Sequence, residues 1–419
     1  MSRSPRRHAW SRYRHPRDNS ILDSCLPRRL SSAMDGQQQI EIIPHELYWT
    51  TAHAAPKDTG SVKYFCIDDE LVYQPFVNDF GPLSLASTWR YCKKVEWLLS
   101  QERGRRRLVQ YTSFHPHKRA NAACVAGCYR VIVLGMSPQE AWRPLSTADP
   151  PFMPFRDATY GASSANLYII DVLRGLHRAM ELKWFDYASF DVNFFEFYET
   201  VENGDFNWII PGKMLAFAGP SPTDRDASGW RVCTPEHFIP IFRSLNIGVV
   251  VRLNQKQYDR QRFISNGVKH VDLYFADGSC PPSEIIDRFL HVAENQENAV
   301  AVHCKAGLGR TATLIGLYAM KHYGISALEF IGWVRLARPG SILGPQHQFL
   351  IEMEAEMMKA GSRASVEEVT AKLGNLALTP PRERKDLVQP DSPFARPDKN
   401  QGERLTETKR QAQQQRVAS

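Results

Sequence analysis

The chain has 419 residues, of which 43% are hydrophobic, so it is long enough for two cores of ordinary domain size with unstructured ends. Its eight cysteines include no CxxC pair, which argues against a disulfide framework and favours a reducing compartment. No run approaches the roughly 18 apolar residues of a membrane-spanning helix, and no apolar signal-peptide core follows Met1. We therefore expect a soluble, intracellular protein with no membrane partner.

The formal net charge of +7 is unevenly placed, because much of the excess lies near the beginning of the chain. The arginines there are Arg3, Arg6, Arg7, Arg12, Arg14, Arg17, Arg28 and Arg29. We expect residues 1–39 to form a disordered basic leader that serves as a nuclear or nucleolar address, a transit-like peptide or a contact for an anionic partner such as nucleic acid. A solvated tail without a receptor is the alternative.

Ordered structure is expected from residue 40, and residues 40–185 are expected to form a first domain. Short apolar runs predict strands at 40–43, 47–49, 64–67 and 108–111. Apolar positions at helical spacing predict helices at about 83–99 and 121–134.

The two halves of the chain contain an internal repeat. Segments 127–137 and 316–326 share a Gly-x-Tyr and a Gly-x-Ser at the same spacing. Extending this register without gaps sets His115 opposite Cys304, and Asn121 opposite the arginine six positions after that cysteine. The first half is thus predicted to be a copy of the second without its nucleophile and arginine. Chance similarity between two amphipathic helices is the alternative.

Residues 186–206 interleave aromatic and acidic side chains and are expected to form a linker helix between the domains. In a helix the carboxylates of Glu196, Glu199 and Glu202 would lie near one face. The usual meaning of such a row is a solvated helix face. The sharper hypothesis is an acidic groove that binds basic residues beside the scissile phosphate of a substrate.

Residues 207–361 alternate between strands and helices. Strands are expected at 208–210, 214–218, 247–252, 271–275 and 299–302, and helices at 235–245, 282–294 and from about 308, 326 and 345. This alternation predicts an α/β fold with a largely parallel sheet covered on both faces. Residues 362–419 are rich in Glu, Arg, Gln, Lys and Pro and are expected to be disordered.

The chemistry is concentrated in one loop between a predicted strand and a predicted helix. Its sequence is His303-Cys304-Lys305-Ala306-Gly307-Leu308-Gly309-Arg310-Thr311. A strand that ends before a helix N-terminus gathers unpaired amide hydrogens and the positive end of a dipole, and Gly307 and Gly309 let the backbone curl around one anion. The loop is therefore predicted to bind a phosphate group beside the Cys304 sulfur.

Three further residues of this loop receive roles. Arg310, six positions after the cysteine, is predicted to grip two phosphoryl oxygens with its guanidinium. Cys304 would attack as a thiolate. Thr311 could donate its hydroxyl to that sulfur, although a hydroxyl in the first turn of a helix is an equal alternative. His303 is assigned only the role of orienting the loop.

Transfer of a phosphoryl group to sulfur requires an acid that protonates the leaving oxygen. Asp277 is the candidate, because it follows a predicted strand and opens the loop 277–282. Asp272, which lies inside that strand, is the competitor. No cluster of His and Asp with metal-ligand spacing is present in the sequence, so neither a metal nor another cofactor is expected.

At this point four motifs resemble the cell-division-cycle-fourteen dual-specificity phosphatases. They are HCKAGLGRT, DGSCPP at 277–282, RPGSILGPQHQFL at 338–350 and VENGDFNWIIPGK at 201–213, and the resemblance runs from about residue 40 to 358. It implies two tandem dual-specificity-phosphatase-like domains, of which the first is catalytically empty.

The resemblance also implies a function and site roles. Cys304 would be the nucleophile, Arg310 the phosphate clamp and Asp277 the general acid, and Gln346 or Gln348 would orient the hydrolytic water. Substrates would be phosphoproteins with Ser-Pro sites followed by basic residues, the marks of cyclin-dependent kinases. Phosphothreonine and phosphotyrosine would also be hydrolysed, in cell-cycle control and mitotic exit. The expected location is the nucleus or nucleolus, with cytoplasm or spindle as further sites.

Two other functions compete with this one. A phosphoinositide phosphatase also begins its loop with HCKAG, but it carries a second lysine where this chain has Leu308. A non-catalytic scaffold could use both domains to bind phosphoproteins. Retention of Cys304, Arg310 and Asp277 together argues against the scaffold.

Overall fold

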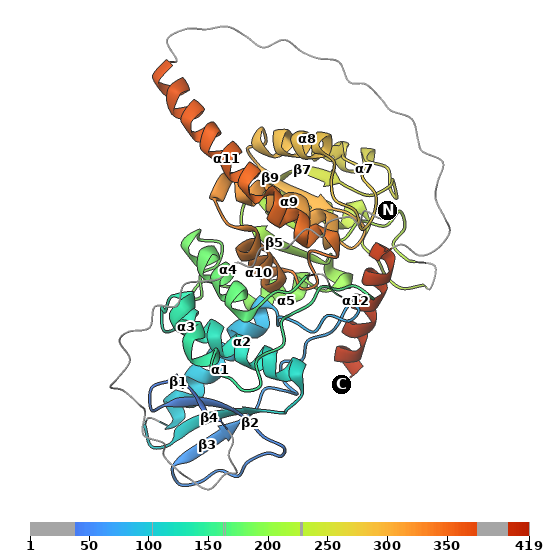
Figure 1. Ribbon diagram of the computed structural model, residues 1–419. Coiled ribbons are helices and arrows are strands. Elements are labelled where there is room, and N and C mark those ends of the chain that lie inside the picture. Colours follow the sequence, from blue (N-terminus) through green and yellow to red (C-terminus); the bar gives the residue numbers. More distant parts are fainter. Residues whose placement is uncertain are drawn as a thin grey trace, which may run out of the picture. The chain divides into compact units, whose positions relative to one another are not determined.

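The structure is a computed structural model, and it describes residues 38–102, 104–161, 163, 165–226, 229–374 and 401–418. Two sheets that are mostly parallel are flanked by helices, which confirms the predicted α/β fold (Figure 1). The predicted basic leader, apart from its last two residues, lies outside the described residues.

The first sheet has the strand order β1-β2-β4-β3. Its strands are β1 (Ile40–Ile43), β2 (Leu47–Thr51), β3 (Val62–Phe65) and β4 (Arg107–Thr112). β1 is antiparallel to β2, whereas β2 and β3 both pair with β4 in parallel. The helices of this half are α1 (Leu85–Glu102), α2 (Pro116–Ile132), α3 (Pro138–Leu145) and α4 (Ile169–Glu181). The sequence patterns predict neither α3 nor α4.

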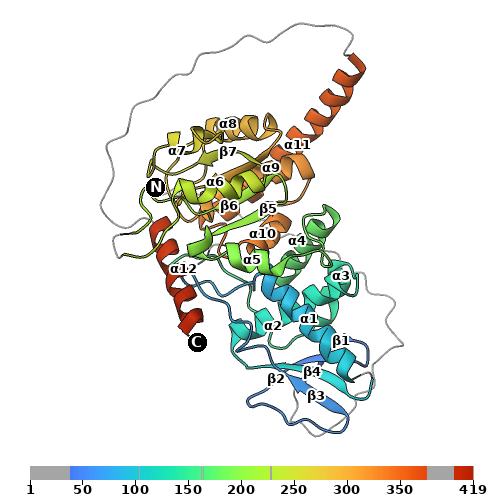
Figure 2. The same cartoon turned by 180° about the vertical axis from the view of Figure 1, so that it is seen from behind.

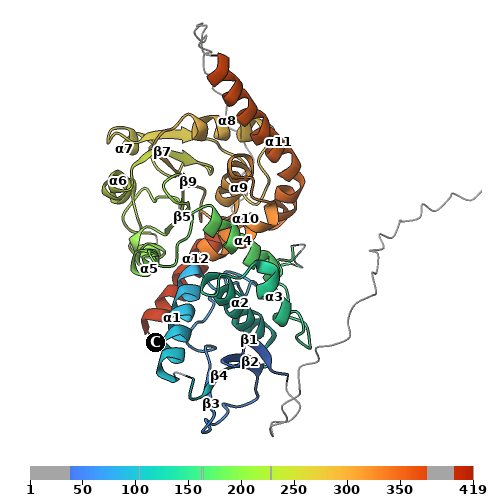
Figure 3. The same cartoon turned by 90° about the vertical axis from the view of Figure 1, so that its left-hand side faces the viewer.

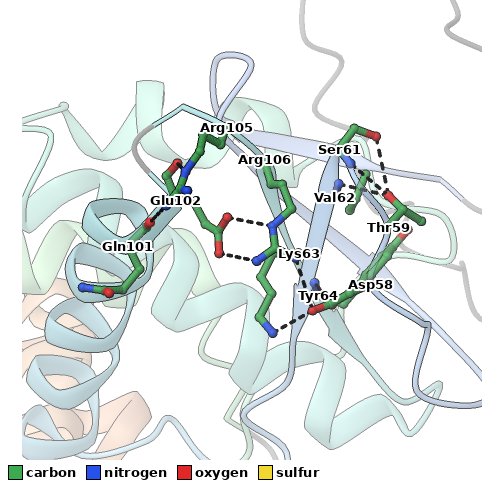
Figure 4. Close-up of polar contacts among 10 residues, drawn as sticks. All are labelled: Asp58, Thr59, Ser61, Val62, Lys63, Tyr64, Gln101, Glu102, Arg105 and Arg106. Carbon is green, nitrogen blue, oxygen red and sulfur yellow. Dashed lines mark hydrogen bonds and ion pairs between the residues drawn. The ribbon is translucent and has the colours of Figure 1, made fainter.

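Ion pairs hold the edge of this first sheet (Figure 4). Arg106 donates through Nε and Nη2 to the two carboxylate oxygens of Glu102 at the end of α1, each at 2.7 Å. Asp58 accepts from Lys63 Nζ at 2.7 Å and from the N–H of Tyr64 at 2.9 Å. The Arg106–Glu102 pair joins the residue before β4 to the end of α1, and the Asp58 contacts tie the segment before β3 to that strand.

The second sheet has the strand order β5-β6-β9-β7-β8. Its strands are β5 (Phe206–Ile210), β6 (Met214–Phe217), β7 (Ile247–Arg252), β8 (Lys269–Asp272) and β9 (Ala299–His303). Only the β5–β6 pair of this sheet is antiparallel. The helices of this half are α6 (Pro235–Ser244), α7 (Gln261–Ile264), α8 (Ser283–Glu294), α9 (Gly309–Tyr323), α10 (Ala327–Ala337) and α11 (Pro345–Gly374).

Side chains of the central strand β9 alternate between two hydrophobic cores. Val300 and Val302 pack in the core that includes α8 and α9, whereas Ala299 and Ala301 pack in the core that includes α6 and α7. Figure 2 shows these four helices around the second sheet. A parallel strand that is buried on both faces reads as a continuous apolar run, which is why the sequence identifies it. The strand therefore carries Cys304 to the carboxyl edge of a fully covered sheet.

The predicted linker helix over residues 186–206 is wrong as a single helix. The segment forms the short helix α5 (Val192–Tyr198) and the 3-10 turn η1 (Val201–Asn203). Thr200 has extended dihedral angles (φ −77°, ψ 146°), and Gly204 has a φ of 121° that turns the chain into β5. These backbone conformations interrupt the helical row that the three glutamates would need.

The prediction that residues 362–419 are disordered is also wrong in two segments. Helix α11 continues to Gly374, and α12 spans Gln401–Ala418. α12 is held by tertiary contacts, because Leu405 is 2% exposed and both Lys409 and Arg410 form ion pairs with acidic side chains. Local composition does not report such contacts. Residues 375–400 lie outside the described residues.

Two glycines allow α4 and α10 to cross with their backbones in contact (Figure 3). A Cβ on Gly175 would lie 2.2 Å from the carbonyl oxygen of Glu329, and one on Gly332 would lie 2.5 Å from that of Asp171. No larger residue fits either position without moving a helix. The two halves of the chain therefore share one continuous hydrophobic core.

Candidate active site

Cys304 follows β9 directly and is 3% exposed. The backbone carbonyl groups of residues 304–308 all accept hydrogen bonds, from His303 and from groups beyond the loop. Cys304 O faces His303 Nδ1 (2.8 Å), and Lys305 O faces Gly219 N (2.8 Å). Arg338 binds the next two carbonyls, Ala306 O through Nη2 (2.9 Å) and Gly307 O through Nε (2.8 Å). Leu308 O faces Ile342 N (3.4 Å). Since the N–H and C=O of a peptide unit point in opposite directions, this arrangement turns the amide hydrogens of the loop inward.

The two glycines of the loop are required by close packing. Gly307 has a φ of +68°, and a Cβ there would lie 2.1 Å from the carbonyl oxygen of Phe217. A Cβ on Gly309 would lie 2.8 Å from Gln346 Oε1. Ala306 and Leu308 are buried, and only Lys305 among the loop side chains is partly exposed. The loop therefore presents backbone rather than side chains to its centre.

Arg310 is the second residue of α9 and is 3% exposed. Its Nη1 donates to Phe275 O at 3.0 Å and to Leu253 O at 3.3 Å, which fixes the plane of the guanidinium. Its Nη2 lies 2.9 Å from Asp277 Oδ1, and its Nε is buried with no hydrogen-bond partner among the described residues. The Nε and Nη2 edge is the one that binds two oxygens of an oxyanion.

Asp277 lies at the loop and Asp272 does not. Asp277 contacts Arg310 through Oδ1, and its Oδ2 accepts a hydrogen bond from the N–H of Gly402 at 2.8 Å. Asp272 is held by Arg252 at 2.7 Å on the far strand of the sheet. Only Asp277 is therefore placed to exchange a proton with an atom bound at Cys304.

A chain of buried hydrogen bonds supports the loop from below. His303 Nδ1 donates to the carbonyl of Cys304, so its Nε2 is the acceptor for the Tyr258 hydroxyl at 2.7 Å. The hydroxyl oxygen in turn accepts from His270 Nε2 at 2.9 Å. Burial lowers the pKa of His303 to about 3 and that of His270 to about 4, so both rings are neutral at pH 7. His303 thus orients the loop and does not carry protons.

The structure distinguishes the two candidate glutamines. Gln346 is buried, and its Nε2 donates to Ser279 O at 3.1 Å, which ties it to the loop that carries Asp277. Gln348 is exposed and bonds to Glu352 along its own helix. The Thr311 hydroxyl is buried without a partner among the described residues, and no hydrogen bond joins it to the Cys304 sulfur there. Gln346 is therefore the glutamine that can touch a water at the site.

The three predicted groove glutamates do not gather on one surface. Glu196 forms an ion pair with Arg90 of α1 at 2.5 Å. Glu199 lines a cavity together with Tyr73, Phe76 and other residues, and Glu202 lies exposed in η1. Of these three glutamates, Glu199 is the one that lines this cavity.

A second acidic side chain, Asp205, is connected to the loop through Arg338, and the sequence patterns assign it no role. Asp205 is 3% exposed and lies 3.0 Å from Arg338 Nη2, the same guanidinium that binds the Ala306 and Gly307 carbonyls. Burial raises the pKa of Asp205, but Arg338 and Lys409 outweigh it and hold that pKa below its ordinary value. Both Asp205 and Arg338 lie within the family motifs, and this position is the signal that the sequence offers.

The matching position in the first half has no comparable loop. In the repeat register Pro116 corresponds to Lys305, yet α2 already begins at Pro116. His115 caps this helix by accepting from His117 N at 3.3 Å, and Asn121 donates to Phe80 O at 2.5 Å. Helix occupies the place of the phosphate loop, so the described first half contains neither a nucleophile nor a guanidinium clamp at this point.

Two features are absent from the described residues. No group of three or more His, Cys, Asp or Glu side chains is arranged there to hold a metal ion. No helix in the described part of the chain is long and apolar enough to cross a bilayer.

Two family descriptions match separate parts of the chain. "Dual specificity protein phosphatase, N-terminal half" matches residues 41–179, and "Dual specificity phosphatase, catalytic domain" matches residues 235–356. The second match contains the loop at Cys304 and the Asp277 segment.

Curated relatives match over most of the chain. Human dual specificity protein phosphatase CDC14A is 45% identical over 395 residues, which cover 89% of this chain and 66% of the relative. Human CDC14C is 44% identical over 337 residues, covering 80% of this chain and 74% of the relative. The tyrosine-protein phosphatase cdc-14 of Caenorhabditis elegans is 43% identical and covers 81% and 48%. The chain spans between about half and two thirds of the length of the CDC14A relatives that it matches.

Proposed function

Because the chain belongs to the CDC14 family of dual specificity phosphatases, we propose that it hydrolyses phosphomonoesters of proteins through a cysteinyl-phosphate intermediate. One observation supports the proposal: Arg338 holds the Ala306 and Gly307 carbonyls of the loop that begins at Cys304, and Arg310 at the end of this loop lies 2.9 Å from the Asp277 carboxylate. This set of groups suffices for transfer of a phosphoryl group to sulfur.

The reaction has two steps. In the first, the Cys304 thiolate attacks phosphorus, Arg310 and the loop amides hold the equatorial oxygens, and Asp277 gives a proton to the leaving oxygen of the substrate. In the second, water attacks the phosphocysteine, Asp277 takes a proton from this water, and the thiolate leaves as inorganic phosphate is released. Gln346, whose Nε2 donates to Ser279 in the loop that carries Asp277, would orient that water. Arg310 must first exchange its contact with Asp277 for the phosphate.

We further propose phosphoserine in Ser-Pro sites followed by basic residues as the preferred substrate. The cavity beside the loop is lined by Asp205 and Asp226 together with Lys305, and Glu199 lines the neighbouring cavity. Such carboxylates attract a cation that follows the phosphorylated residue. A role in cell-cycle control and a nuclear or nucleolar location, with cytoplasm or spindle as further sites, follow the same proposal, and the basic leader would supply the address or bind an anionic partner.

A phosphopeptide series tests this function. Turnover is measured by phosphate release from peptides with Ser-Pro-x-Lys, Ser-Pro-x-Glu, Thr-Pro and phosphotyrosine sites, with Cys304→Ser as the inactive control. We expect the highest kcat/KM for Ser-Pro-x-Lys. Equal rates for the lysine and glutamate peptides would contradict the acidic recognition.

The phosphoinositide alternative lacks support at the loop. Leu308 is 1% exposed and packs against Phe76 and Leu343, so this position brings no second cation toward a multiply phosphorylated ring. A soluble inositol phosphate added to the same assay should therefore be a poor substrate.

A further inference from the structure

Helix α12 lies over the candidate active site with one face. Most of the contacts identified between α12 and the rest of the protein come from one helix face, whose residues follow one another at spacings of three and four: Gly402, Leu405, Thr406, Lys409, Arg410 and Gln413. Arg404, on the other side of the helix, reaches the ring of Tyr160. Gln411 on the opposite face is exposed. This pattern is that of an amphipathic helix docked in a groove.

The first contact is with the general acid. The N–H of Gly402 donates to Asp277 Oδ2 at 2.8 Å, while Arg310 holds Oδ1 at 2.9 Å. A Cβ on Gly402 would lie 2.6 Å from the Cβ of Lys305, so the helix backbone rests directly on the phosphate loop. With α12 in place, both oxygens of Asp277 face donors and none faces a leaving group.

The second contact is apolar. Leu405 is 2% exposed and joins a small cluster with Ala306 and Leu308 of the loop and with Phe76 and Leu343. Burial of this leucine side chain removes apolar surface from water and so stabilises the docked helix. The cluster thus fastens α12 to the loop that must bind phosphate.

The third contact is electrostatic and uses the proposed recognition carboxylates. Lys409 pairs with Asp205, and Arg410 pairs with Asp226. Arg404 lies over the ring of Tyr160, 5.7 Å from its centroid. The basic side chains of α12 therefore occupy the positions at which basic residues of a substrate would bind.

We propose that α12 is an intramolecular occupant of the substrate cleft, which closes the active site until a phosphoprotein displaces it. The proposal deepens the phosphatase function and rests on it. A phosphopeptide that reaches Cys304 must pass where residues 402–405 lie, and its cations must take Asp205 and Asp226 from Lys409 and Arg410. An occupant on the same chain also needs no encounter in solution, which favours it over free peptides.

The test uses full-length variants. Leu405→Asp with Lys409→Glu places charge in the apolar cluster and reverses the ion pair with Asp205. The matched control, Thr408→Glu with Gln411→Glu, adds two negative charges on the opposite side of the same helix. A cleft that is closed in about nine molecules of ten lowers the apparent affinity for substrate about tenfold, so we expect kcat/KM for a phosphoserine-proline peptide to rise about tenfold in the first variant, mainly through KM. The control should behave as the unaltered chain.

A second readout does not depend on turnover. In Cys304→Ser protein, hydrogen exchange of the α12 amides should be slow, and it should become fast when the phosphopeptide is added or when Leu405→Asp and Lys409→Glu are present. Unchanged kcat/KM in the first variant, or α12 amides that exchange equally fast in all proteins, would overturn the proposal. Absence of phosphatase activity in every variant, by contrast, would overturn the proposed function and leave the exchange result to decide whether α12 docks.

Discussion

At the scale of single residues, the account rests on how charge is arranged around one sulfur. The inward amides of residues 305–309 and the Arg310 guanidinium supply positive potential at the place where a phosphate dianion binds. Such preorganised donors stabilise the transition state without rearrangement during the reaction. Asp277 donates the proton that the leaving oxygen of the substrate needs, whereas the backbone amides only form hydrogen bonds.

Asp277→Ala should slow turnover according to the leaving group. General acid catalysis contributes about 100-fold to 10,000-fold, so we expect a loss of that order for a phosphoserine peptide, whose alkoxide needs a proton. The loss for para-nitrophenyl phosphate should be far smaller, because its phenoxide is a good leaving group. Steady-state rates for both substrates measure the difference.

Asp272→Asn serves as the comparison, because Asp272 contacts Arg252 and not Arg310. It should leave the ratio of the two rates unchanged. Equal losses for both substrates in Asp277→Ala would remove Asp277 from the role of acid.

At the scale of elements, sequence patterns identify β9, the loop and α9 because each signal is local. The apolar run 299–302, the glycines and the helical spacing after Gly309 all fall within one short segment. The connector (residues 186–206) and the tail (residues 362–419) are not predicted correctly, because their structure depends on other causes. α5 ends because of the backbone angles at Thr200 and Gly204, and α12 is stabilised by Asp205 and Asp226 from distant segments. Patterns within a segment do not report either cause.

In the active site, too, sequence patterns reveal local roles but not contacts between distant segments. Cys304, Arg310 and Asp277 were assigned because each has a chemical role that its neighbours reveal. Arg338 binds the backbone of the loop, and Tyr258 binds His303, which orients the loop. Such contacts between distant segments exist only after the chain has folded. The choice between Gln346 and Gln348 likewise depends on which side of α11 packs inward.

Gly307→Ala should disable the loop rather than the fold. A left-handed residue other than glycine costs roughly 1–2 kcal/mol, and the added Cβ would also meet the Phe217 carbonyl at 2.1 Å. Because the loop must shift, we expect kcat/KM to fall by about 100-fold or more, the range seen when oxyanion donors are lost.

Gly212→Ala is the matched control for this variant. Gly212 has a similar φ of +72°, but nothing lies within 4 Å of its added Cβ. Urea unfolding should show a small loss of stability in both proteins, whereas only Gly307→Ala should lose activity. Full activity in Gly307→Ala would show that the loop does not need its observed backbone.

At the scale of the whole molecule, both halves of the chain depend on one core. α4 of the first half meets α10 of the second at Gly175 and Gly332, and Arg338, which follows α10, binds the phosphate loop. The first half has no loop of its own, since α2 begins where that loop would be. Its place in the molecule is therefore to support the second half and to contribute Phe76 to the wall beside the loop.

Buried neutral histidines should make folding stability depend on pH. Burial lowers the pKa of His303 to about 3 and those of His270 and His347 to about 4, from an ordinary value of 6.5. Below pH 6.5 the unfolded chain binds protons that the folded protein does not, so stability falls as the pH drops from 6.5 toward 4. Each ring contributes about 1.4 kcal/mol per pH unit at most.

Urea unfolding at pH 7, 6 and 5 measures this slope. His347→Gln should reduce it, whereas His237→Gln, at an exposed position, should not. A slope that is the same in all three proteins would show that His347 does not remain neutral in the fold.

The most direct measurement of the central claim is the chemical identity of the phosphorylated intermediate. The full chain and its Asp277→Asn variant are mixed briefly with a phosphoserine-proline peptide, quenched in acid, digested and mapped by mass spectrometry. The account predicts one phosphoryl group on Cys304, and none in Cys304→Ser, which should also lack turnover. Phosphate on any other residue, or turnover that survives in Cys304→Ser, would contradict it.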